Sequence, residues 1–215
     1  MSRRYPATIA APVDRELVVR KSRFIARLSP VSSPEEADAV IAAVRKSSWD
    51  ARHHCVAMVT GVLGDQARSS DDGEPSGTAG IPMLEVLRRR ELTDVVAVVT
   101  RYFGGVKLGT GGLVRAYSTA VSEALDHAAI VRRAALTRMT VEVPHTDAGR
   151  IDNLLREWVT THGATLGETG YSAAATFDLW VPETLVSRLR DDLASASSGA
   201  LVPVVGEERI VDVRA

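Results

Sequence analysis

Short segments of alternating hydrophobic and polar residues occupy the first 130 positions of the chain, and they are separated by segments with apolar residues at helical spacing. The period of two predicts strands and the period of 3.6 predicts amphipathic helices. The predicted strands span 16–20, 24–28, 54–60 and 94–100, and the predicted helices begin near Pro34, Ile81 and Leu113. The last of these strands is nearly all apolar, which is typical of a central strand buried on both faces.

The first predicted helix has the clearest N-terminal signal. Ser33 stands at the expected N-cap, Pro34 at the first helical position, and Glu36 would complete a capping box. The apolar positions that follow, from Ala37 to Val44, would face the core. A polar segment over 65–78 is predicted to be a loop.

The last 80 residues have a different order of elements. A strand at 137–143 precedes a helix that Thr146 would cap and that Gly163 would end. Strands at 165–168 and 173–181, a turn at Gly170, a helix over 185–193 and a strand at 201–213 complete the pattern. This βαββαβ order is the split-βαβ or ferredoxin-like arrangement. The sequence therefore predicts an α+β protein with two domains, residues 1–133 and 134–215.

The composition is that of an ordinary globular chain. Of its 215 residues 45% are hydrophobic and 25% are charged. No apolar run approaches the roughly 18–20 residues that a membrane span needs, and no signal peptide is visible. A single cysteine, Cys55, cannot form an internal disulfide, which fits a reducing compartment. We expect a soluble, cytoplasmic protein without a membrane partner.

The net charge of −1 conceals an asymmetry between the two parts. Residues 1–135 contain 19 Lys and Arg against 15 Asp and Glu, whereas residues 136–215 contain 7 against 12. A basic first part favours an anionic partner, although two unrelated solvated surfaces would give the same count.

Half of the 16 glycines lie between Gly73 and Gly112, in one cluster over 71–80 and another over 101–115. Each cluster leads into a predicted helix, where uncovered backbone N–H groups and the helix dipole favour an anion such as phosphate. The alternative is a structural crossover loop in which the two clusters pack together. The candidate anion- or nucleic-acid-binding residues are Arg101, Gly104, Gly105, Lys107, Gly109, Thr110, Gly111, Gly112 and Arg115.

The familiar nucleotide motifs are absent from this segment. Lys107 is followed by Leu108 rather than by Ser or Thr, and the glycines at Gly109 and Gly111 lead to Val114 where a third glycine would be needed. The pattern is therefore neither a P-loop nor a Rossmann fingerprint.

Acidic side chains at Asp71, Asp72 and Glu74 form a second candidate site, together with Ser76 and Thr78. They could bind Mg²⁺ or act as acid and base. Such residues are more often solvated, cap the following helix, or pair with Arg101 or Arg115, and the last interpretation is the one we favour. We expect no metal and no cofactor.

Two further groups of residues have mainly structural interpretations. Alternation along a strand places His53 and Cys55 on one face and His54 on the other, so a histidine–cysteine pair is not formed by these neighbours. Hydrogen-bonded or core histidines are expected instead. Tyr102 and Phe103 could stack on bases or pack against the fold.

Three blocks resemble the IMPACT/YigZ family: Ala51–Cys55, Asp71–Gly80 with Pro82 and Met83, and Arg101–Tyr117. Lys21–Ile25 matches as well, and the resemblance covers roughly residues 15–130 closely. It implies an N-terminal domain similar to domain four of elongation factor G and to a ribosomal protein. It also implies a C-terminal domain similar to the ferredoxin-like domain five of that factor.

Eukaryotic members of the family regulate translation. For a bacterial YigZ-type member the resemblance implies only this general role in translation control. Some bacterial relatives have been described as proline peptidases, but the sequence shows no dinuclear metal ligand set. The resemblance supplies no catalytic residues.

Three functions therefore remain open. The first is a nucleic-acid- or ribosome-associated regulator, with RNA or the ribosome as partner. The second is an enzyme that acts on a small phosphate-bearing substrate through the acidic loop, and the third is a protein-interaction module. We favour a function in binding over one in catalysis.

Overall fold

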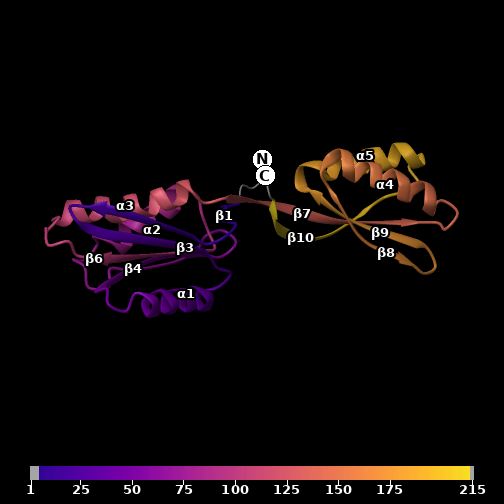
Figure 1. Cartoon of the computed structure of the whole chain (residues 1–215). Coiled ribbons are helices and arrows are strands. Elements are labelled where there is room, and N and C mark those ends of the chain that lie inside the picture. Colours follow the sequence, from indigo (N-terminus) through magenta and orange to yellow (C-terminus); the bar gives the residue numbers. More distant parts are fainter. Residues whose placement is uncertain (1–4, 214–215) are drawn as a thin grey trace. The chain divides into compact units, whose positions relative to one another are not determined.

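The computed structural model describes residues 5–213, which form two compact units (Figure 1). Residues 5–132 belong to the N-terminal unit and residues 133–212 to the C-terminal unit. Both units combine helices with an antiparallel sheet, so the architecture is the mixed α/β, two-domain one expected from the sequence. Within the described residues, no helix combines the length and the apolar character needed to cross a bilayer.

The N-terminal unit is built on a five-stranded sheet. Its strand order is β2 (Val13–Val19), β3 (Ser22–Pro30), β6 (Val95–Tyr102), β4 (His53–Thr60) and β5 (Gln66–Ser70). The apolar segment predicted to be a central strand is β6, which pairs antiparallel with β3 on one side and β4 on the other. That prediction is confirmed, and the reason is physical, since a strand covered on both faces places most of its side chains in a core.

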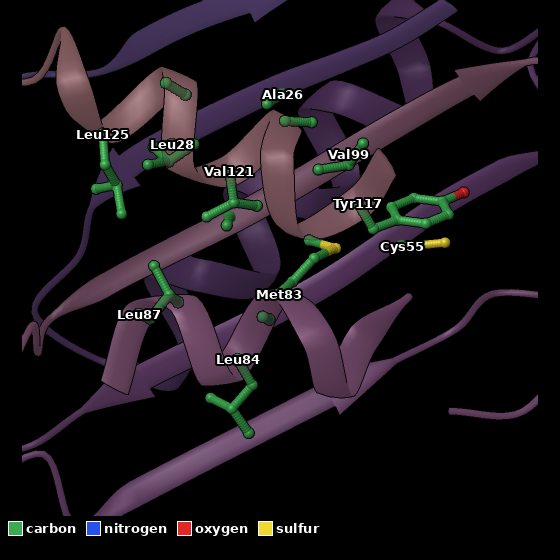
Figure 2. Packing of buried hydrophobic residues seen from close by; sticks show 14 of the residues in the cluster. Ala26, Leu28, Cys55, Met83, Leu84, Leu87, Val99, Tyr117, Val121 and Leu125 are labelled. Carbon is green, nitrogen blue, oxygen red and sulfur yellow. The ribbon is translucent and has the colours of Figure 1, made fainter. Parts of the chain in front are cut away.

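Helices cover both faces of this sheet (Figure 1). The helix α1 (Pro34–Ser47) lies on one face, while α2 (Gly80–Arg89) and α3 (Thr110–Asp126) lie on the other. Figure 2 shows Met83 and Leu87 of α2 meeting Val121 of α3 over the strands, and Tyr117 nearby is fully buried. The larger core of the unit is therefore on the side of α2 and α3.

Two local expectations in this unit need correction. The segment predicted as a loop over 65–78 contains the edge strand β5, which pairs with β4 alone. Its sequence Gln-Ala-Arg-Ser-Ser is mostly exposed, so no hydrophobic alternation marks it. The N-cap Ser33 accepts from the Glu36 amide as expected, but the Glu36 carboxylate reaches back to the amide of Ser32 rather than to that of Ser33.

The first strand, β1 (Thr8–Ile9), pairs antiparallel with the beginning of β7 (Ile130–Val143). Ile9 is fully buried in the core beneath α2 and α3. This short strand thus fixes the start of the N-terminal unit beside the first residues of β7, shortly after α3 ends.

The C-terminal unit follows the order β7, α4 (Ala148–His162), β8 (Thr165–Tyr171), β9 (Ala175–Pro182), α5 (Val186–Ser197) and β10 (Val204–Val213). A single 3-10 turn, Glu183–Leu185, precedes α5. The strands lie in the order β8, β9, β7, β10. Both helices pack on one face of the sheet through a core that includes Ile151, Leu155, Phe177, Leu179, Leu189 and Leu193.

In this unit the prediction for the end of α4 is confirmed, because Gly163 adopts the left-handed conformation that ends the helix. The prediction for its beginning is wrong. The N-cap is Asp147, which makes no side-chain capping bond, one residue after Thr146. The turn predicted at Gly170 is also displaced, since Gly170 pairs with Thr176 inside the hairpin and the reversal lies at residues 172–174.

Candidate functional site

A groove of about 740 Å³ opens in the N-terminal unit, at the edge of the sheet where β6 ends and β4 begins. We refer to it as the β6–α3 groove. Its walls come from three segments that are distant in sequence, within residues 50–53, 74–75 and 101–113. The lining residues are Asp50, Ala51, Arg52, His53, Glu74, Pro75, Arg101, Tyr102, Phe103, Lys107, Leu108, Gly109, Thr110 and Leu113.

The pairing of strands explains why these segments meet. His53 of β4 lies opposite Arg101 of β6, so the residues before β4 and those after β6 share one edge of the sheet. The chain leaves β5 next to β4 and passes through Glu74 on its way to α2. The two glycine-rich clusters are therefore brought together, which agrees with one of the two interpretations left open by the sequence, that of a crossover loop.

A buried ion pair joins the two clusters. Nη1 of Arg101 donates to both oxygens of Glu74, at 2.7 and 3.0 Å, and the Tyr117 hydroxyl donates to Oε1 at 2.7 Å. The Arg101 and Glu74 side chains are only 8% and 3% exposed. The predicted contact between the acidic loop and Arg101 is thus confirmed for Glu74. Burial raises the pKa of Tyr117, so its hydroxyl stays a donor.

The guanidinium of Arg101 lies between two aromatic rings. Its central carbon is 5.4 Å from the centroid of Phe24 and 5.5 Å from that of Phe103. Phe24 is fully buried, whereas Phe103 is 58% exposed in the groove wall. Arg101 therefore supports a ring that is open to solvent, and its Nε has no hydrogen-bond partner among the described residues.

The other acidic residues have structural partners. Oδ1 of Asp71 accepts from the amides of Ala79 and Gly80, and Oδ2 accepts from the amide of Gly77, so this carboxylate caps α2. Partial burial favours a higher pKa for Asp71, but these three hydrogen bonds together hold its pKa below the ordinary value. The role of a helix cap, one of the interpretations open from the sequence, is the one that Asp71 takes.

Asp72 accepts from the backbone amide of His54 and from Arg45, each at 2.7 Å. Thr78 donates to the carbonyl of Pro75, and Ser76 is exposed. Across residues 5–213, no cluster of three His, Cys, Asp or Glu side chains could hold a metal ion. The acidic loop therefore serves mainly to fix the position of its own backbone.

The start of α3 borders the groove. Gly109 is the N-cap, with a φ of 71°, and no side chain within residues 5–213 caps this end of the helix. The amides of the first turn are consequently not covered by a capping side chain, which leaves the positive end of the helix dipole open to an anion.

The glycines of the second cluster fall into distinct groups. A Cβ at Gly104 would stand 2.0 Å from the backbone of Lys21, so the close approach of these two backbone segments excludes any side chain there. Gly105 and Gly109 adopt positive φ, at 85° and 71°. Gly111 has neither reason, because outside its own helical turn no atom of the described residues lies within 4 Å of its Cβ position, and its φ is not in the positive range. The fold itself does not account for this glycine.

Basic residues are distributed unevenly around these glycines. Lys107 and Arg52 line the groove, are exposed, and take part in no ion pair among the residues described. Arg115, in contrast, lines a different hollow beside Leu17 and Val19, and its Nε donates to the carbonyl of Gly111. Of the three cations grouped by sequence, the structure therefore brings Arg101 and Lys107 together and places Arg115 elsewhere.

Arg52 was not among the candidates from the sequence. Its only local signal is its place in the block Ala51–Cys55, ahead of β4. The strand pairing that carries it to the groove is a long-range feature. The contact of Tyr102 is also a long-range one. Its hydroxyl donates to Asp50, 52 residues away, and so ties two walls of the groove together.

The histidines are hydrogen bonded, as expected. Nδ1 of His53 lies 2.9 Å from the carbonyl oxygen of Asp72, and Nε2 of His54 lies 3.1 Å from that of Ser48. Cys55 is fully buried and its thiol donates to the carbonyl of Asp71.

Cys55 is expected to resist thiol reagents in the native protein. Burial raises its pKa to about 12, above an unfolded value near 9, so the reactive thiolate is scarce at pH 8. Native protein should react with iodoacetamide far more slowly than urea-unfolded protein, and mass spectrometry would follow the reaction. Because the folded pKa is the higher one, this group contributes stability below pH 9 that is lost as the pH rises toward 12. Rapid alkylation of the folded chain at pH 8 would contradict this placement of the thiol.

Comparison with known proteins adds the following. Residues 20–125 match the family model described as Impact N-terminal domain, and residues 141–200 match a domain of unknown function, DUF1949. The chain is 43% identical to IMPACT family member YvyE of Bacillus subtilis, over 89% of this chain and 87% of that protein. It is 39% identical to IMPACT family member YigZ of Escherichia coli, over 93% and 97%.

A solved structure described as that of a hypothetical protein is also similar. It aligns with a TM-score of 0.61 and 37% sequence identity, and the alignment covers 95% of this chain and 98% of the other. The matched Impact segment contains the whole β6–α3 groove, because the lining residues lie between positions 50 and 113.

Proposed function

The chain belongs to the IMPACT family, and from this premise we propose that it is an RNA- or ribosome-associated regulator of translation that binds single-stranded RNA in the β6–α3 groove. One observation carries the proposal. The groove combines an exposed aromatic ring, Phe103, with two cations, Arg52 and Lys107, that form no ion pair with any described residue, and it borders a helix terminus that no described side chain caps.

The charges of the groove support an anionic ligand. The Arg101–Glu74 pair is neutral as a unit, and Asp50 is the other carboxylate in the lining. Arg52 and Lys107 remain to attract phosphate groups, and the first turn of α3 adds its uncovered amides. A strand of RNA presents phosphates at regular intervals, so it would meet both cations at once.

The aromatic residues support a single-stranded ligand. Bases that are free of a duplex stack on exposed rings, and proteins use such platforms to bind RNA with little sequence preference. Phe103 offers an exposed ring in the wall of the groove, backed by Arg101. A double helix would expose no base face to it.

We also propose the finer fold assignments made from the sequence. The βαββαβ order of the C-terminal unit, with strands arranged β8, β9, β7, β10 in the sheet, supports a ferredoxin-like domain. An N-terminal domain similar to domain four of elongation factor G fits the same proposal, since that likeness connects the chain with the ribosome.

The geometry gives less support to catalysis by the acidic loop. Asp71 caps α2, Asp72 binds Arg45 and a backbone amide, and Glu74 is enclosed by Arg101 and Tyr117. None of the three carboxylates is left as a free acid, base or metal ligand. The alternative of a protein partner for the groove is favoured if wild-type protein binds no RNA in the following experiment.

Removing both free cations should weaken RNA binding. In Arg52→Ala/Lys107→Ala, the dependence of log K on log salt should fall by about 1.4, since each phosphate contact on a single strand contributes about 0.7. If the effect is all counterion release, affinity at 100 mM salt falls about 25-fold. Fluorescence anisotropy with a labelled single-stranded oligoribonucleotide at several salt concentrations measures both quantities.

The matched control is Arg88→Ala/Arg190→Ala. These two arginines are exposed, take part in no ion pair among the described residues, and lie outside the groove lining. Their removal lowers the net charge equally but should leave most of the affinity intact. A folded Arg52→Ala/Lys107→Ala variant with the wild-type affinity and salt slope would contradict the proposal, as would wild-type protein that binds no RNA at 50 mM salt.

A further inference from the structure

We infer that the β6–α3 groove holds one nucleotide unit in a defined orientation, with its base stacked on Phe103 and its phosphate at the first turn of α3. This inference rests on the proposed function, because it specifies how the same groove recognises its ligand. The shared chemistry is that of a nucleoside monophosphate, whose source is either a free nucleotide or a residue of an RNA strand.

The position of the phosphate follows from the end of α3. Gly109 supplies no side chain over this end, and Lys107 lies in the same wall of the groove. The glycine at position 111 costs helix stability and meets no protein atom that would require it. A bare backbone is useful where a ligand approaches the amides closely, so a bound phosphate gives this glycine a reason.

An independent observation comes from Arg101. Its side chain is 8% exposed, lines the groove, and keeps an Nε–H that no described residue accepts. A buried charged donor without a partner is rare in proteins, and it points to an acceptor that the chain itself does not supply. Of the guanidinium nitrogens, Glu74 accepts only from Nη1, so the guanidinium at the groove wall keeps unused donor capacity apart from the helix terminus.

The position of the base follows from Phe103. The ring is held against the Arg101 guanidinium, which is fixed in turn by Glu74, and it is still 58% exposed. Tyr102, the next residue back, is tied to Asp50 across the groove. The aromatic wall is therefore placed before any ligand arrives, which lowers the entropic cost of binding.

The size of the groove limits the ligand. A volume of about 740 Å³ lies within the range of about 300–1,000 Å³ that is usual for small-molecule sites. It accommodates a nucleotide unit and is too small for a folded RNA element. Longer RNA would consequently leave most of its length outside the groove.

Calorimetry on the full chain with four probes tests the inference. The probes are adenosine 5′-monophosphate, adenosine, inorganic phosphate, and a single-stranded hexaribonucleotide with a 5′-phosphate. Adenosine 5′-monophosphate should bind more tightly than adenosine or phosphate, because it makes both contacts. Phe103→Ala should weaken it by about 5- to 150-fold, the loss of one base–aromatic stack. Phe103→Tyr should retain binding, and Tyr171→Ala, which removes a ring that is 69% exposed in the C-terminal unit, should have no effect.

The outcomes separate this inference from the proposed function. Binding of both the nucleotide and the RNA, each weakened by Phe103→Ala, supports the inference with RNA as the source. Binding of the nucleotide alone supports it with a free nucleotide as the source and contradicts the proposed function. RNA binding that is unchanged in Phe103→Ala overturns the inference while the proposed function stands. Equal binding of adenosine, phosphate and the nucleotide overturns it as well.

Discussion

Glu74→Ala should destabilise the N-terminal unit by about 3–5 kcal/mol, because it leaves the buried charge of Arg101 without a partner. The same substitution removes the acceptor of the Tyr117 hydroxyl, a second buried polar group. It also releases the guanidinium that supports Phe103 in the groove wall. Urea unfolding followed by circular dichroism would measure the loss of stability.

Two further variants make this result specific. Glu85→Ala removes a carboxylate of α2 that forms an exposed ion pair with Arg89, and it should cost less than about 1 kcal/mol. Glu74→Leu combined with Arg101→Met replaces the pair by apolar groups and should recover much of the lost stability. If Glu74→Ala were no more harmful than Glu85→Ala, the ion pair would not be buried as described.

Gly104→Ala should destabilise the N-terminal unit by about 1–3 kcal/mol or more, since the added methyl group has no space. Its Cβ would stand 2.0 Å from the carbonyl carbon and 2.1 Å from the carbonyl oxygen of Lys21. Both are backbone atoms, which cannot turn aside as a flexible side chain can. The hydrogen bond from the Gly104 amide to the Ser22 hydroxyl should also be lost. Thermal and urea unfolding would measure the change.

Gly111→Ala is the matched substitution in the same cluster. No atom lies within 4 Å of its Cβ position, so alanine should be tolerated and should raise stability by up to about 0.5–1 kcal/mol. Under the inference above it should also weaken binding of adenosine 5′-monophosphate. Equal destabilisation by the two substitutions would show that both glycines serve the fold alone.

Much of the fold could be predicted from local pattern. The apolar run that became β6 and the capping signal at Ser33 are strong because they reflect burial and backbone hydrogen bonding within a few residues. The edge strand β5 was missed because it is exposed and pairs on one side only, so its residues need not be apolar. The displaced turn near Gly170 shows the same limit, since the glycine pairs within the hairpin and does not form its reversal.

The candidate site was predictable only in part. The glycine clusters were visible in the composition, and charge led us to expect a contact of the acidic loop with Arg101 or Arg115, of which Glu74 with Arg101 is the pair that forms. Arg115 was grouped with Lys107 by proximity in sequence, but it stands on α3 and lines a different hollow. Arg52 enters the groove through the pairing of β4 with β6, and that long-range register is not visible in a local pattern.

Nuclear magnetic resonance of the isotopically labelled full chain tests the central claim, that the β6–α3 groove binds single-stranded RNA. On titration with a hexaribonucleotide, the backbone amides of Phe103, Thr110 and Gly111 should shift and saturate together, because they border the groove and the open end of α3. The resonances of amides in the last turn of α2 should not shift. If RNA bound while those three resonances did not move, or moved only with the rest of the surface, the groove would not be its binding site.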